Sequence, residues 1–169
     1  GKASHVTLIH VGLADAEATL RKGLALGADD AVRIDINAAD TFEVAFQIAE
    51  FARSQQFDII LTGKETIQYN SSAVGGILAG ILDLPFVSYA CKLELTSAST
   101  LQLEAEIDGG TQVLECSMPA VISCAKGMAE QRIPNMRGIM AARSKPLQVL
   151  TPQNHTEKGK TITYELNPG

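Results

Sequence analysis

Three features of the sequence predict an α/β fold with a doubly wound, mainly parallel sheet and an added antiparallel hairpin. In the first half of the chain, short apolar runs rich in β-formers alternate with stretches whose apolar residues recur at helical spacing. The run FDIILTG at 57–63 shows little polar alternation, which is typical of a parallel strand buried on both faces. In the second half, two alternating runs flank the turn Asp-Gly-Gly at 108–110, a strong hairpin signal.

The first half is expected to contain three strand–helix pairs. Gly27 stands where the first helix should end, Asp40 is placed to cap the second, and Pro85 follows the end of the third. The expected strands cover 5–12, 31–35 and 57–63, and the helical patterns cover 13–30, 41–56 and 71–83.

The second half is expected to be richer in strands. Alternating or buried strand patterns cover 86–96, 101–108, 111–118 and 120–125. Residues 126–145 indicate a basic loop whose only acid is Glu130. A chain of 169 residues suffices for one ordinary domain, so we expect a single α/β domain over 1–150 and an extended polar tail over 151–169.

Composition excludes several classes of function. The net charge of −5 argues against a nucleic-acid partner, which favours a basic face. No apolar run approaches the length of a membrane span, so direct membrane insertion is not expected. Cys91, Cys116 and Cys124 are odd in number and lie in apolar surroundings, which favours core thiols in a reducing cytoplasm over a disulfide or a metal site.

No catalytic constellation emerges, but two glycine turns follow strand ends. In an open α/β sheet, ligands bind beyond the carboxyl ends of the strands, where helix N-termini offer free N–H groups. One interpretation is an adenine-nucleotide crevice, with Val11 and Gly12 along one wall and the Gly63–Gly75 loop along the other. The other interpretation is a pair of tight packing turns, and spacing alone does not separate the two.

The basic loop carries apolar residues among its cations. Ile133, Met136, Ile139 and Met140 lie in a segment that also contains glycine and proline. Such residues act either as core plugs or as an anchor for a partner, and composition favours neither.

With these segments in order, the sequence resembles the β-subunit of electron transfer flavoprotein. The resemblance rests on VTLIHVG, TLRKGLALGADDAVRI, DIILTGKETI, EIDGG, and PAVIS followed by RIPNMRGIMAARSKPL. It implies a Rossmann-like sheet related to other adenine-nucleotide binders. It also implies a heterodimer with an α-subunit that carries the redox-active FAD, while the β-subunit holds AMP or a second FAD. The family role is that of an electron carrier, not an enzyme, between flavin dehydrogenases and a respiratory or quinone-linked acceptor.

The chain departs from the family pattern at two places. Where the family loop usually carries acids, then Gln and Thr or Val before the glycine, this chain has Gln68, Tyr69 and Asn70, then 73–75 as Ala-Val-Gly. Backbone N–H groups of 71–76 are therefore expected to take over phosphate binding. The family's leading strand before VTLIHVG has no counterpart here, so an exposed sheet edge or altered pairing is expected.

The resemblance assigns two sets of site residues. The expected nucleotide-binding residues are Val11, Gly12, Gly63, Ile67, Gln68, Asn70, Ser71, Ser72, Val74 and Gly75. The expected partner-recognition residues are Arg132, Met136, Arg137, Ile139 and Arg143. In this alignment Met136 takes the place of the family's apolar anchor, a leucine. The alternative function is a stand-alone adenine-nucleotide-binding regulatory module of the stress type, which would form homodimers without flavin.

Overall fold

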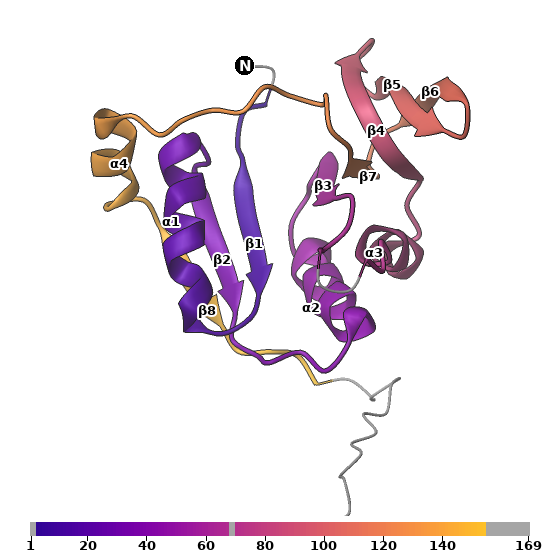
Figure 1. Ribbon diagram of the computed structural model, residues 1–169. Helices are drawn as coiled ribbons and strands as arrows, with labels where there is room; N and C mark the ends of the chain where they lie inside the picture. The colour runs from indigo at the N-terminus through magenta and orange to yellow at the C-terminus, as the bar shows by residue number, and fades with distance from the viewer. Residues whose placement is uncertain (1–2, 68–69, 155–169) are drawn as a thin grey trace, which may run out of the picture.

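A computed structural model describes residues 3–67 and 70–154 of the chain (Figure 1). The expected C-terminal tail lies outside the described residues except for 151–154. The elements are β1 (Thr7–Val11), η1 (Ala14–Ala16), α1 (Glu17–Leu26), β2 (Asp30–Ile34), α2 (Thr41–Arg53), β3 (Ile59–Gly63), α3 (Val74–Leu82), β4 (Phe86–Leu95), β5 (Thr100–Ile107), β6 (Gly110–Ser117), β7 (Ala120–Cys124), α4 (Met136–Ala142) and β8 (Leu147–Leu150).

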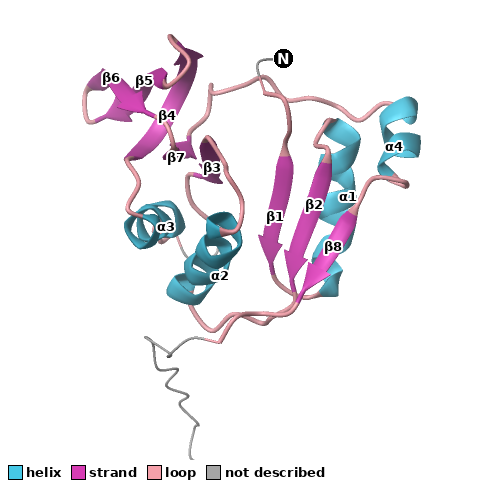
Figure 2. Cartoon of the chain, turned by 180° about the vertical axis from the view of Figure 1, so that it is seen from behind, coloured by secondary structure: helices cyan, strands magenta, loops and turns pink. Residues whose placement is uncertain are grey.

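The described strands form two sheets. The first is parallel, in the order β1-β2-β8, and the second runs β3-β7-β4-β5-β6, with β3, β7 and β4 parallel and β5 and β6 antiparallel. The chain is thus an α/β protein with mainly parallel strand pairs and an antiparallel extension, as the sequence predicts. The strands divide into two sheets because β1 and β3 are edge strands that do not pair with each other (Figures 1 and 2).

The parallel register places the carboxyl ends of the strands together. Val11 is the partner of Ile34, which is in turn the partner of Leu150, so β1, β2 and β8 end at one level. In the other sheet Gly63 is the partner of Cys124. The turns that follow these strand ends are where an open α/β sheet binds its ligands.

Helices cover the two sheets separately. Figure 2 shows the three-stranded sheet in front of α1, whose buried Leu20 and Leu24 pack with Ala31 of β2. Buried Ala45 and Ala49 of α2 pack with Leu78 of α3 and Val121 of β7. Small residues on α2 and α3 allow these helices to approach closely. A third core joins the inner faces of β4, β5, β6 and β7.

Local signals in the sequence predicted several helix ends and turns correctly, although the helix expected over 13–30 is shorter, with α1 at Glu17–Leu26. The side chain of Asp40 accepts a hydrogen bond from the N–H of Glu43 at 2.8 Å, which is the expected cap of α2. Gly27 has φ 130° after α1, and Gly109 has φ 84° in the turn between β5 and β6.

Two elements were not predicted. Helix α4 lies inside the segment expected to be a loop, where Asn135 caps it by accepting from the N–H of Gly138 at 2.8 Å. Strand β8 lies between the expected loop and tail, and it adds to the far edge of β2. No helix in the described part of the chain is long and apolar enough to cross a membrane.

Candidate functional site

A cavity of about 290 Å³ opens at the carboxyl end of β3, on the side that faces β1. Its lining residues are Ile9 from β1, Ile48 from α2, Ile60, Leu61, Thr62 and Gly63 from β3, Lys64, Glu65, Thr66, Ser71, Ser72 and Ala73 from the loop, and Val74, Gly75 and Leu78 from α3. We call this cavity the β3 crevice. Most of its apolar side chains come from β1, α2, β3 and α3, and most of its polar side chains come from the loop.

Five of the ten residues expected to bind nucleotide line the β3 crevice: Gly63, Ser71, Ser72, Val74 and Gly75. Two others, Val11 and Gly12, are not among its lining residues and lie just beyond Ile9 along the chain. Ile67 is 97% exposed and Asn70 is also exposed. Gln68 lies outside the described residues.

The start of α3 supplies the hydrogen-bond donors of the β3 crevice. Its N-cap residue, Ala73, makes no side-chain cap hydrogen bond, so the side chain at this position does not satisfy a first-turn N–H group. Asn70 and Ser72 adopt left-handed backbone, with φ of 46° and 49°, and they turn the chain into the helix. An uncapped helix N-terminus beside a cavity suits an anionic group such as a phosphate.

Gly75 is buried because the helix crosses close over β3. A Cβ at Gly75 would come within 2.8 Å of the Thr62 hydroxyl and 2.9 Å of the Phe86 ring. That hydroxyl has no hydrogen-bond partner in the described part of the chain. Gly75, expected as a nucleotide-binding residue, therefore also has a packing role that the sequence does not reveal.

Lys64, the only base of the loop, contacts side chains of β4 and β5. Its ammonium lies 3.6 Å from the carboxylate of Glu106 and 4.8 Å from the ring centre of Tyr89. Tyr89 has φ 53° at an irregularity in β4, where register shifts between Val87 and Ala90. The charge of Lys64 is thus partly balanced by the carboxylate of Glu106.

A buried arginine that sequence reasoning did not single out holds the turn after β1. Arg33 on β2 donates from Nη1 to the carbonyl of Gly12 at 2.9 Å and from Nε to Glu17 at 3.1 Å. Its Nη1 also donates to Asp35, and this hydrogen bond is the main cause that raises the pKa of Arg33. The N–H of Gly12 donates to Ile34 at 3.0 Å. A lone arginine inside the apolar strand pattern AVRID was the available signal.

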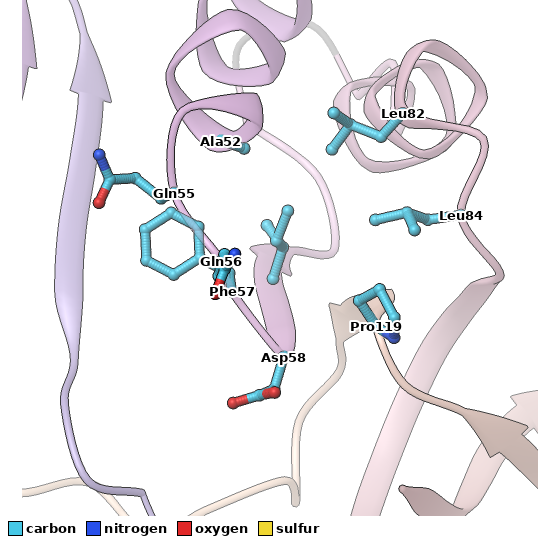
Figure 3. A pocket seen from close by; sticks show the side chains of 9 residues that line it. Ala52, Gln55, Gln56, Phe57, Asp58, Leu82, Leu84 and Pro119 are labelled. Carbon is cyan, nitrogen blue, oxygen red and sulfur yellow. The ribbon is translucent and has the colours of Figure 1, made fainter.

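A second cavity, of about 370 Å³, lies at the opposite end of β3 (Figure 3). Leu82, Leu84, Pro119 and Phe57 give it an apolar lining, and Asp58 is its only titratable lining residue. A single carboxylate in an apolar cavity does not form an acid–base pair, so this cavity offers binding contacts rather than chemistry.

The segment around α4 exposes an apolar and basic surface. Ile133, Met136, Ile139 and Met140 are 86%, 74%, 41% and 62% exposed, respectively. Three arginines of the same segment, Arg132, Arg137 and Arg143, are also exposed, and none forms an ion pair within 3–67 or 70–154. We call these seven residues the α4 surface. Met136 is therefore not a core plug, and exposed apolar side chains gathered in one segment are typical of interaction sites.

The cysteines and histidines that the structure describes do not form a further site. Cys91, Cys116 and Cys124 are free thiols, and burial raises the pKa of both Cys116 and Cys124. His5 is paired with Asp30 at 3.0 Å. Among the described residues no group of His, Cys, Asp and Glu is arranged to hold a metal ion.

Comparisons with a family model and with individual proteins match this chain to the same family. The model of the electron transfer flavoprotein domain matches residues 1–154. The electron transfer flavoprotein subunit beta of Syntrophomonas wolfei is 36% identical over 169 residues, which cover 99% of this chain and 67% of that protein. The proteins of the same name from Bacillus subtilis and Homo sapiens are 32% and 31% identical, with 86% and 96% of this chain covered. The chain spans 58% and 64% of the length of these two relatives.

Proposed function

Because this chain belongs to the electron transfer flavoprotein family, with relatives that are β-subunits, we propose that it is the non-catalytic subunit of a heterodimeric electron carrier. In this proposal it pairs with an α-subunit that holds the redox-active FAD. The heterodimer carries electrons from flavin dehydrogenases to a respiratory or quinone-linked acceptor.

The observation that carries this proposal is the α4 surface. A module that only senses a nucleotide has no need of four exposed apolar side chains beside three arginines that form no ion pair with the described residues. The apolar residues suit a pocket on a partner, and the arginines suit a rim of carboxylates around it. Arg132, Met136, Arg137, Ile139 and Arg143 are the proposed recognition residues.

We further propose that the β3 crevice binds the phosphate of AMP or of a second FAD. The residues present fit such a group, because the N-terminus of α3 has no side-chain cap and the left-handed residues before it open the loop. Ser71, Ser72, Val74 and Gly75 would contact the phosphate through backbone N–H groups. Val11 and Gly12, held by Arg33, form the proposed second wall near the adenosine.

Co-expression with the α-subunit encoded in the same genome tests the proposal. The heterodimer should show yellow flavin absorbance that the isolated β-chain does not show, and its FAD should be reduced by a flavin dehydrogenase from that genome. Extraction and chromatography of its nucleotides would identify AMP or a second FAD. A homodimer that holds an adenine nucleotide without flavin, and that ignores the α-subunit, would instead favour the stand-alone regulatory module.

A further inference from the structure

Helix α4 needs support from outside itself. It has only seven residues, and an isolated helix shorter than about 12 residues is marginal in water. Most of its side chains are exposed, and Ala142 is its only buried residue. The position of Met136 therefore depends on what holds α4 in place.

Close packing against α1 provides part of that support. Ala142 is 4% exposed and belongs to the core cluster of Leu20 and Leu24. Gly138 lies so close to the carbonyl oxygen of Ala25 that a Cβ would not fit without a shift. The two helices thus touch through small residues, which give a close approach but little buried apolar area.

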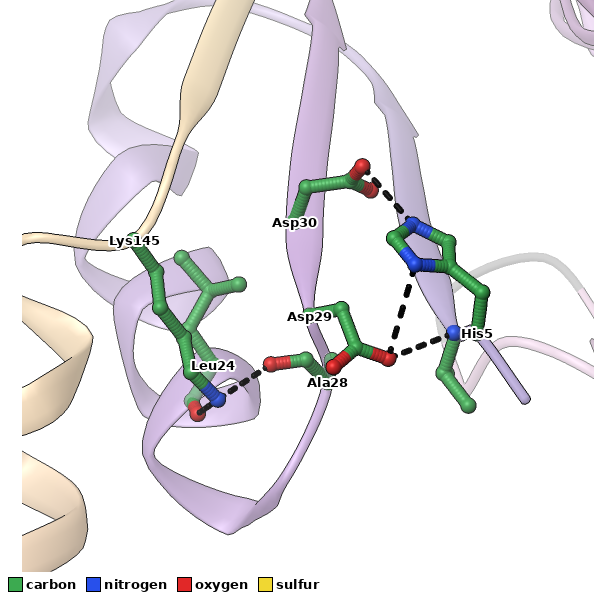
Figure 4. A network of polar contacts seen from close by, with 7 residues as sticks. His5, Leu24, Ala28, Asp29, Asp30 and Lys145 are labelled. Atoms are coloured by element: carbon green, nitrogen blue, oxygen red, sulfur yellow. Dashed lines mark hydrogen bonds and ion pairs between the residues drawn. The ribbon is translucent and has the colours of Figure 1, made fainter. Parts of the chain in front are cut away.

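Two cations cap the ends of the two helices reciprocally. Arg21 of α1 donates from Nη1 to the carbonyls of Ala142 and Lys145, at 2.8 and 2.7 Å, where α4 ends. Lys145 donates from Nζ to the carbonyls of Leu24 and Ala28, at 3.0 and 2.5 Å, where α1 ends (Figure 4). The last carbonyls of a helix have no partner within it, and a cation there also interacts favourably with the helix dipole.

We propose that Arg21 and Lys145 are positioning residues for partner recognition, since together they dock α4 on α1 and so fix where the α4 surface stands. This inference rests on the proposed function. Neither residue belongs to the α4 surface, and both side chains make part-buried hydrogen bonds to the main chain. They act on the partner only through α4.

The role can be tested in the heterodimer with Arg21→Met, Lys145→Met and the control Lys22→Met. Lys22 is the neighbouring cation on α1, is exposed, and makes no ion pair within the described ranges 3–67 and 70–154. We expect Arg21→Met and Lys145→Met to speed hydrogen exchange of the α4 amides and tryptic cleavage after Arg137 at least ten-fold. Exchange in β4, β5 and β6 should not change, and Lys22→Met should behave as the wild type.

Electron transfer supplies the second readout. With a flavin dehydrogenase from the same genome as the electron donor, both variants should raise the apparent KM for the carrier at least five-fold while kcat and flavin content stay constant. Arg21→Lys keeps a cation that can donate to one of the carbonyls. Its KM and exchange rates should therefore lie between those of Arg21→Met and the wild type. Unchanged exchange in α4, or faster exchange with an unchanged KM, would overturn the role. If Arg21→Met does not fold, Lys145→Met and Arg21→Lys decide the question by the same readouts.

A wild-type heterodimer that accepts no electrons would overturn the proposed function, and the positioning role with it. If the wild-type heterodimer transfers electrons and the variants have the same KM as the wild type, only the positioning role is overturned. The two failures are therefore distinguishable.

Discussion

The buried amide of Gln47 forms two hydrogen bonds with the backbone of Gln153, as a neighbouring β-strand would. Its nitrogen donates to the Gln153 carbonyl at 2.7 Å, and its oxygen accepts from the Gln153 N–H at 2.9 Å. Gln47 lies on α2 and is 1% exposed. The segment that leaves β8 runs beside the β2–α2 connection to reach it (Figure 1). This contact therefore ties the three-stranded sheet to the helices of the other half.

Replacing Gln47 should destabilise the protein without changing its fold. Gln47→Met keeps the side-chain volume but leaves both backbone groups of Gln153 without their partner. The expected loss is about 1–3 kcal/mol of unfolding free energy. Urea denaturation of the heterodimer would measure it, with Gln56→Met, an exposed glutamine near the end of α2, as the control. Equal midpoints for the two variants would show that the Gln47–Gln153 contact adds no stability.

The same contact shows what sequence reasoning reaches and what it misses. The Asp-Gly-Gly turn, the Asp40 cap and the Gly27 helix end are local, and each was predicted from adjacent residues. The partner of Gln47 is 106 residues away, so its burial has no local signal.

The unpredicted elements have the same cause. Strand β8 forms because the exposed edge of β2 accepts it, and α4 forms because α1 supports it. The glycine turn at Gly63 was visible in the sequence, whereas the hydrogen bond from Arg33 to the carbonyl of Gly12 depends on the pairing of β1 with β2. Periodicity and turn residues predict the elements whose signals are local. They do not predict elements, such as β8 and α4, that are stabilised by residues distant in the sequence.

Two glycines of α3 should respond to alanine in opposite directions. Gly75→Ala places a methyl against the Thr62 hydroxyl and the Phe86 ring, so we expect a loss of about 1–3 kcal/mol from overpacking. Gly80→Ala meets nothing within 4 Å and should stabilise the helix by about 0.5–1 kcal/mol. Thermal unfolding of the two variants side by side would check this. A Gly75→Ala variant that is more stable than the wild type would show that α3 leaves room for a methyl group beside Thr62.

Gly63 offers a cleaner test of the β3 crevice than Gly75. It lines the cavity, and a Cβ there meets nothing within 4 Å, so Gly63→Val should fold normally. The added branches would fill the space proposed for the nucleotide. We expect AMP affinity to fall at least about ten-fold, which corresponds to about 1.4 kcal/mol. Calorimetry on nucleotide-depleted heterodimer would measure it, and an unchanged affinity would remove the crevice from consideration.

The buried thiol of Cys116 and the partly buried thiol of Cys124 should react slowly with alkylating reagents. Burial raises the pKa of Cys116 and Cys124, so at pH 8 each has less thiolate than an ordinary cysteine. Because the folded pKa is above the unfolded one, the stability linked to these thiols is complete below the unfolded pKa and is lost as pH rises through the folded pKa. Mass spectrometry after iodoacetamide treatment at pH 8 and pH 10 should show labelling of both mainly at the higher pH. Rapid labelling of both at pH 8 would contradict their burial.

Met136 is the residue of the α4 surface whose truncation should most affect partner recognition. It is 74% exposed at the first position of α4, and its flexible thioether suits pockets of different shape. Met136→Ala removes few contacts within the chain, so the unfolding free energy should change by less than about 0.5 kcal/mol. Truncating an anchor that a partner buries costs on the order of 1–2 kcal/mol, which predicts a transfer rate at subsaturating concentration lowered about ten-fold.

Stopped-flow reduction of the heterodimer by its flavin dehydrogenase would measure this rate for Met136→Ala and for Val113→Ala. Val113 is also a largely exposed apolar residue, at 63%, but it lies on β6 in the antiparallel extension, remote from α4 (Figure 1). Only Met136→Ala should slow the reaction, with flavin content and melting temperature unchanged. Higher ionic strength should lower the rate for the wild type and for both variants, because Arg132, Arg137 and Arg143 remain to steer an acidic partner. Equal rates for the two variants would mean that the dehydrogenase docks elsewhere on the heterodimer.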